Sequence, residues 1–191
     1  MPSLLLVLNR IRGVQVLGAL LWLLAASLFY PAGRVAAQSE AYAFETRYAT
    51  IRYSDEADLL DFGKKTGGAS VSLVRDRGKA LSLIKENTDR IVFRVKALLD
   101  MHPELHFNIS VHKSPDEVSG IYKDLGMTGA PPIAFYAHKS HTIFLSPDRL
   151  SDGIFAHEVA HAVINCYFAP PPPPQVQEIL AQYVDKHLWG D

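Results

Sequence analysis

The sequence predicts an α+β fold in a single domain. Strand-like and helix-like segments are interspersed along the chain, two helical segments close it, and no internal repeat is visible. This order is typical of a domain in which helices pack against a small mixed sheet. The 191 residues, of which 48% are hydrophobic, are enough for one substantial core. We expect the domain to span residues 38–191, because residues 1–37 have a different character.

Residues 1–37 are typical of an export signal. Arg10 and Arg12 precede an apolar run over 14–30, and Val35-Ala36-Ala37 offers the small residues that a signal peptidase recognises. The alternative is an N-terminal anchor that stays uncleaved, since about 17 apolar residues approach the lower limit for crossing a bilayer. In either case the remainder of the chain is expected outside the cytoplasm, periplasmic or secreted, with a membrane attachment only if the segment is uncleaved.

Composition limits the partners of the exported part. The formal net charge of the whole chain is −1, and residues 1–37 contribute only positive charges, so the remainder is mildly acidic. Such a chain lacks the basic patch that nucleic-acid binding requires, and we expect no nucleic-acid partner. The one cysteine, Cys166, excludes an intrachain disulfide. Its apolar neighbours Tyr167 and Phe168 predict a buried thiol that contributes to packing.

The first half of the domain is expected to contain a strand and two helices. Residues 43–53 (AFETRYATIRY) alternate and are rich in aromatic and β-branched side chains, which predicts a strand. Residues 54–56 (SDE) predict the start of a helix, and residues 67–68 (GG) predict a turn. Apolar side chains at helical spacing then predict a long helix over about 76–100.

A strand, a short helix and a hairpin are expected next. Residues 106–112 (HFNISVH) alternate as a strand does. Residues 114–117 (SPDE) combine a capping serine, a proline at the first helical position and two acids, so they predict a helix, which ends near Gly126. Residues 133–136 and 142–145 are short strand-like runs on either side of a polar turn, which predicts a hairpin.

Two helices separated by prolines follow. Ser151 or Asp152 is expected to cap a helix that extends to about Phe168. The five prolines at 170–174 prevent its continuation, and the next helix is expected over about 175–188. In polyproline II geometry five prolines span about 15 Å, a stiff path that can return the second helix beside the first. The alternative for this run is a ligand for an SH3-like or WW-like domain, but such partners are not expected outside the cytoplasm.

The segment His157-Glu158-Val159-Ala160-His161 predicts a metal site on the first of these two helices. Residues four positions apart share one face of a helix, so both imidazoles can point at one ion. Neutral imidazole suits Zn²⁺, and a catalytic zinc has three protein ligands and one open position. Glu158 lies beside the metal instead of binding it, where it can take a proton from water. The alternative is a surface helix that carries two histidines and a solvated glutamate.

Glu178 lies in the opening turn of the following helix and is the candidate for the third ligand. If the proline run returns that helix beside the first, Glu178 faces His157 and His161. Ala181, one turn later, is small and lets the two helices approach closely. The alternative for Glu178 is an exposed acid near the positive end of its helix.

At these residues the chain resembles the gluzincin metallopeptidases, the thermolysin-like superfamily, and particularly its smallest members. The resemblance covers residues 133–191, about a third of the chain. Within it, Ala134-Phe135-Tyr136 is similar to the edge strand at the rim of the active site, and the histidine helix follows. Glu178, Ala181 and Tyr183 then match the Glu-x-x-Ala-x-Tyr pattern found in many small bacterial members.

The resemblance implies a zincin-like domain with an active-site helix and a C-terminal glutamate helix. One Zn²⁺ would be held by His157, His161 and Glu178, and Glu158 would be the general base that activates water. The expected activity is hydrolysis of peptide bonds in a peptide or protein substrate that pairs with the strand at 134–136. Two alternatives stay open: a non-catalytic zincin-like metal-binding protein of the cell envelope, and a structural zinc module with four ligands.

The chain departs from the family pattern at two points. Gln182 stands where thermolysin-like enzymes have an acid that supports a ligand histidine, and Asp185 is a candidate to replace that acid. Larger gluzincins also use a tyrosine or histidine from a further subdomain to stabilise the oxyanion. The candidates for that role in this chain are Tyr136, His138, His141, Tyr167, Tyr183 and His187.

Overall fold

The computed structural model describes residues 42–67 and 69–190. The segment interpreted as an export signal, residues 1–37, lies outside the described residues, as does the expected domain boundary at residue 38. Within the two described ranges, no helix combines the length and the apolar character needed to cross a membrane.

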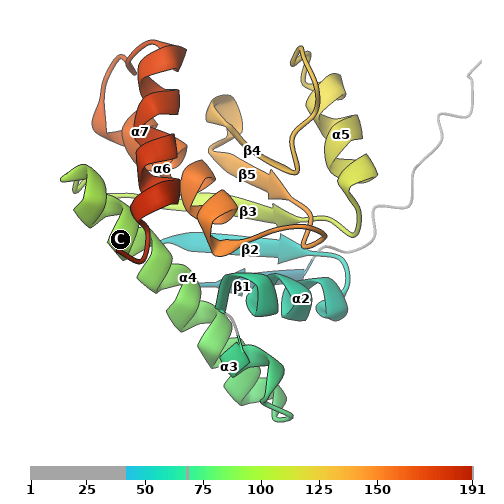
Figure 1. The fold of residues 1–191 in the computed structure, drawn as a ribbon. Helices are drawn as coiled ribbons and strands as arrows, with labels where there is room; N and C mark the ends of the chain where they lie inside the picture. The colour runs from blue at the N-terminus through green and yellow to red at the C-terminus, as the bar shows by residue number, and fades with distance from the viewer. Residues whose placement is uncertain (1–41, 68, 191) are drawn as a thin grey trace, which may run out of the picture. The chain divides into compact units, whose positions relative to one another are not determined.

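One mixed sheet of five strands forms in the described part of the chain (Figure 1). Its order is β1-β2-β3-β5-β4, with parallel pairing in the centre and antiparallel pairing at both edges. β4 is therefore an edge strand, and its outer backbone groups are not paired with another strand. The strands are β1 (Tyr42–Glu45), β2 (Ala49–Tyr53), β3 (Phe107–Val111), β4 (Ala134–Ala137) and β5 (Thr142–Leu145).

Six α-helices accompany the sheet in the described residues. A 3₁₀ turn, η1 (His138–Ser140), joins β4 to β5. The helices are α2 (Glu56–Gly67), α3 (Ala69–Ser72), α4 (Arg77–Leu99), α5 (Pro115–Asp124), α6 (Asp152–Tyr167) and α7 (Pro174–His187). The prediction of a mixed α+β fold is therefore confirmed.

Side-chain caps determine where three of the helices begin. Asp76, Ser114 and Ser151 each accept a hydrogen bond from the backbone N–H three residues later, at the starts of α4, α5 and α6. These starts agree with the sequence prediction. Of the two residues considered for α6, Ser151 is the cap and Asp152 is the first helical residue.

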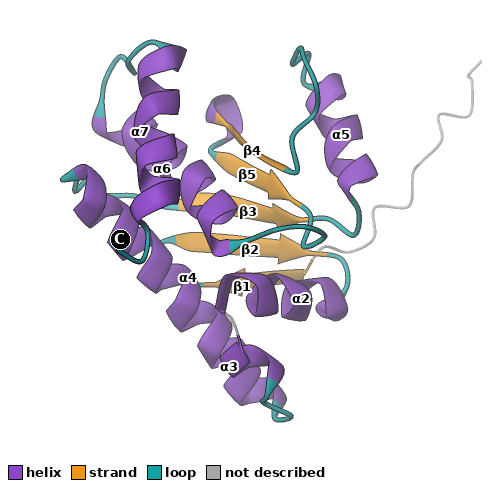
Figure 2. Cartoon of the chain, viewed as in Figure 1, coloured by secondary structure: helices purple, strands orange, loops and turns teal. Residues whose placement is uncertain are grey.

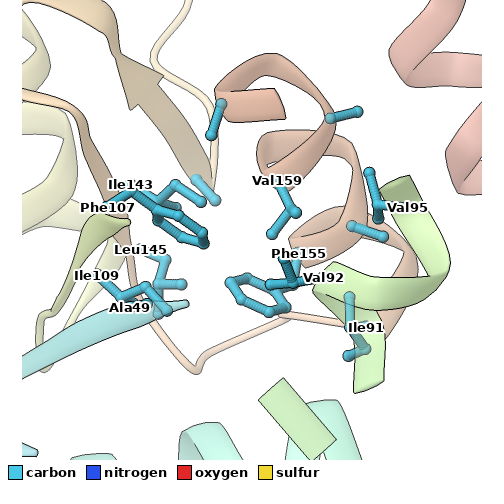
Figure 3. Packing of buried hydrophobic residues seen from close by; sticks show 14 of the residues in the cluster. Ala49, Ile91, Val92, Val95, Phe107, Ile109, Ile143, Leu145, Phe155 and Val159 are labelled. Atoms are coloured by element: carbon cyan, nitrogen blue, oxygen red, sulfur yellow. The ribbon is translucent and has the colours of Figure 1, made fainter. Parts of the chain in front are cut away.

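The main core lies between the sheet, α6 and α4 (Figure 3). Phe155 and Val159 of α6 are fully buried there, between sheet residues such as Ile109 and α4 residues such as Ile91. Phe155 also meets Phe62 of α2 edge-to-face, with 5.4 Å between the ring centroids. Full burial of one such side chain contributes about 1.5–3 kcal/mol to stability. Because Phe155 and Val159 are held in the core, this packing determines which side chains of α6 face away from it.

α5 covers the other face of the sheet near β4. Val118 of α5 packs with Phe135 and Ala137 of β4. Since side chains alternate along a strand, Ala134 and Tyr136 lie on the opposite face, against the main core. The edge strand is thus held by apolar contacts on both faces.

One predicted element has the wrong boundaries. The strand expected over 43–53 is two strands, because Thr46 makes a turn in which its Oγ1 accepts the backbone N–H of Ala49 at 2.9 Å. A hydroxyl group that bonds the local backbone in this way favours a turn over an extended strand. The last helix begins at Pro174, in agreement with the start predicted at about residue 175, and a proline is well accommodated at the first helical position.

Candidate metal centre

α6 places His157 and His161 side by side. Val159 and Val163, two positions after His157 and His161, are fully buried, so the orientation of the helix about its axis is determined by the core. The two imidazole Nε2 atoms lie 3.3 Å apart. At this distance one of the two nitrogens must donate a proton to the other, or a cation must lie between them, because two acceptor lone pairs repel each other.

α7 brings Glu178 to the same point. The loop that joins α6 to α7, teal in Figure 2, contains the first four of the five prolines. Ala181 is fully buried on the inner side of α7, which lets the two helices lie close together, as the sequence predicted. Glu178 Oε2 lies 3.6 Å from His157 Nε2 and 3.7 Å from His161 Nε2.

The spacing of these three donor atoms fits a zinc site. All of them lie within 4.8 Å of one another. With bonds of about 2.0–2.1 Å, neighbouring corners of a tetrahedron around Zn²⁺ are about 3.4 Å apart. The observed separations are 3.3, 3.6 and 3.7 Å. Two imidazoles and one carboxylate are also a ligand set typical of catalytic zinc, so the donor set fits this ion with only a slight contraction.

A hydrogen-bonded network that sequence reasoning missed supports His161. Asn165 Nδ2 donates to the His161 carbonyl oxygen at 2.8 Å and to Gln177 Oε1 at 2.7 Å. The Gln177 side chain also hydrogen-bonds the His161 ring, and its Nε2 donates to the Pro172 carbonyl oxygen at 2.8 Å. The network joins both helices and the proline loop at His161, one of the three candidate ligands. Its only sequence signal is the position of Gln177 next to Glu178.

Burial favours the neutral forms of two groups in this site. It lowers the pKa of His161, and the nearby imidazole of His157 lowers it further. Burial also raises the pKa of Glu158 to about 8, although a hydrogen bond from the Tyr136 backbone N–H opposes this rise. Neutral imidazole is the form that binds a metal, and a carboxyl group with a pKa near neutrality can both accept and release a proton.

Glu158 connects the helix to the edge strand. Its side chain is buried, with 8% relative exposure for the residue, and it accepts a hydrogen bond from the Tyr136 backbone N–H of β4. That N–H therefore points away from β5. Because backbone groups alternate in direction along an antiparallel strand, those of Ala134 also face outward. The outer edge of β4 beside Glu158 thus presents the N–H and C=O of Ala134 to an added strand.

A groove of about 410 Å³ opens beside these residues. Its walls come from the segment that leads into β4, from the residues just before and at the start of α6, and from α7. The lining residues are Pro131, Pro132, Ile133, Ala134, Arg149, Ile154, His157, Glu158 and Asp185.

Tyr136 is one of the candidates for stabilising the oxyanion, and it contacts Glu158 through its backbone N–H. Its hydroxyl is 3.1 Å from His141 Nδ1, and burial raises the pKa of the phenol to about 12, so it keeps its proton at neutral pH. Tyr183 is exposed, and its ring stacks on His187 with 4.4 Å between centroids. Within the described residues, no hydrogen bond, ion pair or ring contact joins Tyr183 to the three donor atoms.

Two further pairs that include oxyanion candidates also lie apart from His157, His161 and Glu178. The His138 ring meets that of His141, with 5.6 Å between centroids, and the Tyr167 ring meets that of Phe168 at 5.0 Å. Neither pair involves a donor atom of the candidate metal centre.

Two further expectations need correction. Asp185 lines the groove with His157, but within the described residues no hydrogen bond joins the two, and the carboxylate lies against Gly153 instead. Cys166 is exposed, not buried, and its Sγ donates to the Glu104 carbonyl oxygen at 3.2 Å. The reason is that the last turn of α6 extends past the core, so its apolar neighbour Tyr167 is exposed as well.

The arrangement can hold a divalent cation with three protein ligands and has a buried carboxyl group beside it. These are the parts that hydrolysis by an activated water requires. Comparisons with protein-family models, with curated proteins and with solved structures found no match, so the interpretation depends on the geometry of the site.

Proposed function

We propose that this chain is an exported zinc-dependent peptidase of the gluzincin type, with a zincin-like fold. The observation that carries the proposal is the convergence of His157, His161 and Glu178 at separations of 3.3–3.7 Å, with the buried Glu158 beside them. The histidine pair alone is a weak signal, because a short motif occurs by chance. Glu178 adds a third donor atom from another helix, at a distance that suits zinc. Chance explains this arrangement less well than it explains the histidine pair alone.

His157, His161 and Glu178 would hold one zinc ion. When bound, Zn²⁺ lowers the pKa of water at its open position to about 7 and polarises a carbonyl group. The Gln177 network would keep the His161 ring in the orientation that binding requires.

Glu158 is the general base of this proposal. It accepts a proton from the attacking water and delivers it to the nitrogen of the leaving amine. Its burial restricts the carboxyl group to one position, and the Tyr136 N–H orients it. A cation at the neighbouring ligands would lower the pKa of Glu158, so that the carboxylate form is available to take the proton.

The substrate would bind as an added strand on β4. An extended peptide can pair with the outward N–H and C=O of Ala134 and with the outward C=O of Tyr136. This pairing would place a peptide bond next to Glu158, because Glu158 bonds the same edge at Tyr136.

The test combines metal analysis with peptide cleavage. The purified exported part is loaded with zinc, its metal content is measured, and a peptide library is digested and read by mass spectrometry. Glu158→Gln should keep one zinc per chain and lose turnover by about 10²–10⁴-fold. Glu86→Gln, an exposed acid on α4, is the matched control and should cleave as the wild type does. Cleavage by Glu158→Gln at the wild-type rate would show that the mechanism is wrong.

A second candidate is a non-catalytic zincin-like metal-binding protein of the cell envelope. The observation that favours it is the position of Tyr183, which is exposed and stacked on His187 instead of contacting the three donor atoms. Stoichiometric zinc without cleavage of any peptide in the library would favour this candidate over the peptidase.

A further inference from the structure

Arg149 lies in the segment between β5 and α6 and lines the same groove as His157 and Glu158. Its backbone has a φ of 62°, in the left-handed region that residues other than glycine rarely adopt. Unusual backbone conformations of this kind cluster at ligand-binding positions, where the surrounding structure maintains them. The conformation therefore singles out Arg149 among the exposed arginines of residues 42–67 and 69–190.

The guanidinium group of Arg149 is available to a ligand. Within the described residues, its side chain forms no hydrogen bond and no ion pair. The other charged groups on the groove are Asp185 and Glu158. Asp185 lies against Gly153, where an added Cβ would be 2.2 Å from Oδ1, and Glu158 is directed to the Tyr136 N–H. Neither carboxyl group neutralises Arg149.

The direction of β4 indicates which part of a substrate reaches Arg149. The strand begins at Ala134, and the groove extends from there over residues 131–133. A peptide that adds antiparallel to β4, the arrangement with the better hydrogen bonds, runs from the Ala137 end toward the Ala134 end. The residues on the C-terminal side of its scissile bond therefore lie in the groove with Arg149.

We propose that Arg149 is a specificity-determining residue that binds a carboxylate on the C-terminal side of the scissile bond. The carboxylate belongs either to an acidic side chain or to the free C-terminus of a short substrate. A guanidinium group is suited to both, because its planar N–H groups match the two oxygens of a carboxylate. The inference rests on the proposed peptidase function, since it uses the zinc and the β4 edge to orient the peptide.

Four hydroxamate probes test the proposal through binding, without any need for turnover. Each has a zinc-chelating hydroxamate followed by Leu-Glu-amide, Leu-Gln-amide, Leu-Ala with a free carboxylate, or Leu-Ala-amide, so the residues after the chelator occupy the C-terminal side. Dissociation constants are measured by calorimetry on the zinc-loaded exported part of wild type, Arg149→Gln, Arg149→Glu and Arg75→Gln. Arg75 is the matched control, an exposed arginine before α4 that does not line the groove.

The wild type should bind at least one acidic probe about tenfold more tightly than its amide counterpart, as a charge-assisted bond predicts. A difference between the Leu-Glu-amide and Leu-Gln-amide probes identifies an acidic side chain as the bound carboxylate. A difference between the two Leu-Ala probes identifies a free C-terminus. Arg149→Gln should abolish the preference with the affinity for the amide probes unchanged within about twofold, which also shows that the variant is folded. Arg149→Glu should reverse the preference, and Arg75→Gln should keep it.

Three results would overturn the inference. They are a wild type without preference, a preference that survives in Arg149→Gln, and an equal loss in Arg75→Gln. In all three the probes still bind, so the proposed zinc site stands. If none of the four probes binds the zinc-loaded wild type, the proposed function fails, and the role of Arg149 fails with it.

Discussion

Gln182 Nε2 donates a hydrogen bond to Glu178 Oε1 at 3.0 Å. The bond joins two residues one turn apart on α7 and leaves the other carboxylate oxygen, Oε2, to face His157 and His161. An acid at position 182, as thermolysin-like enzymes have there, would place a second negative charge one turn from Glu178. The glutamine instead orients the carboxylate of Glu178 without adding charge. Gln182 thus has a structural role in this chain.

Gln182→Ala should weaken zinc binding. Without the bond to Oε1, the half-exposed Glu178 side chain must be ordered by the metal alone, and loss of such a supporting bond costs about 10–100-fold in affinity. Zinc dissociation constants are measured by competition with a chromophoric chelator. Gln175→Ala, an exposed glutamine on the same helix, is the control and should bind zinc as the wild type does. Equal affinities for the two variants would show that Gln182 does not support Glu178.

The parts of the site that follow from local rules could be predicted from the sequence. The caps at Ser114 and Ser151 depend only on residues within three positions, so the starts of these helices could be predicted. The relation of His157 to His161 follows from helix geometry alone. The approach of α7 to α6 was also predictable, because Ala181 at the contact is small and the proline run restricts the path of the loop.

What the sequence did not reveal depends on tertiary contacts. Asn165 and Gln177 are ordinary polar residues until α7 packs against α6 and brings their side chains within 2.7 Å. The turn at Thr46 interrupts an otherwise strand-like pattern through one hydroxyl group. The exposure of Cys166 depends on where the core ends along α6, which the helical pattern does not indicate. Packing between distant segments decides each of these features.

Gly63→Ala should destabilise the fold. Gly63 is buried where α2 packs on α4, and a Cβ there would lie 2.4 Å from Ile84 Cγ1, a fully buried core side chain. Overpacking of this kind costs about 1–3 kcal/mol. The free energy of unfolding is measured by urea titration. Gly120→Ala is the control, because nothing lies within 4 Å of its Cβ position in α5, and alanine there should be neutral or stabilising by up to about 1 kcal/mol. A Gly63→Ala protein as stable as Gly120→Ala would contradict the packing described.

His112 should make stability depend on pH. Burial lowers its pKa below the ordinary 6.5, while the neighbouring acids Glu117 and Asp58 partly oppose this. The unfolded chain then takes up a proton at higher pH than the folded one. The stabilisation is complete above about pH 6.5 and is lost as the pH falls through the pKa of the folded state. His112→Gln should flatten the decline in unfolding free energy between about pH 7 and 5, and His102→Gln, an exposed control, should not. Identical declines in wild type and His112→Gln would contradict this prediction.

Zinc should stabilise the fold by tying α7 to α6. Because the ligands come from both helices, the folded chain binds the ion and the unfolded chain binds it poorly. At free zinc about a thousandfold above the dissociation constant, the gain is about 4 kcal/mol, or roughly 8–16 °C in melting temperature. Thermal unfolding is followed with zinc and with excess chelator. Glu178→Ala should lose most of the shift, because only the two histidines of α6 remain, whereas Glu86→Ala should keep it. A shift of the same size in Glu178→Ala would place the ion away from α7 and exclude Glu178 as a ligand.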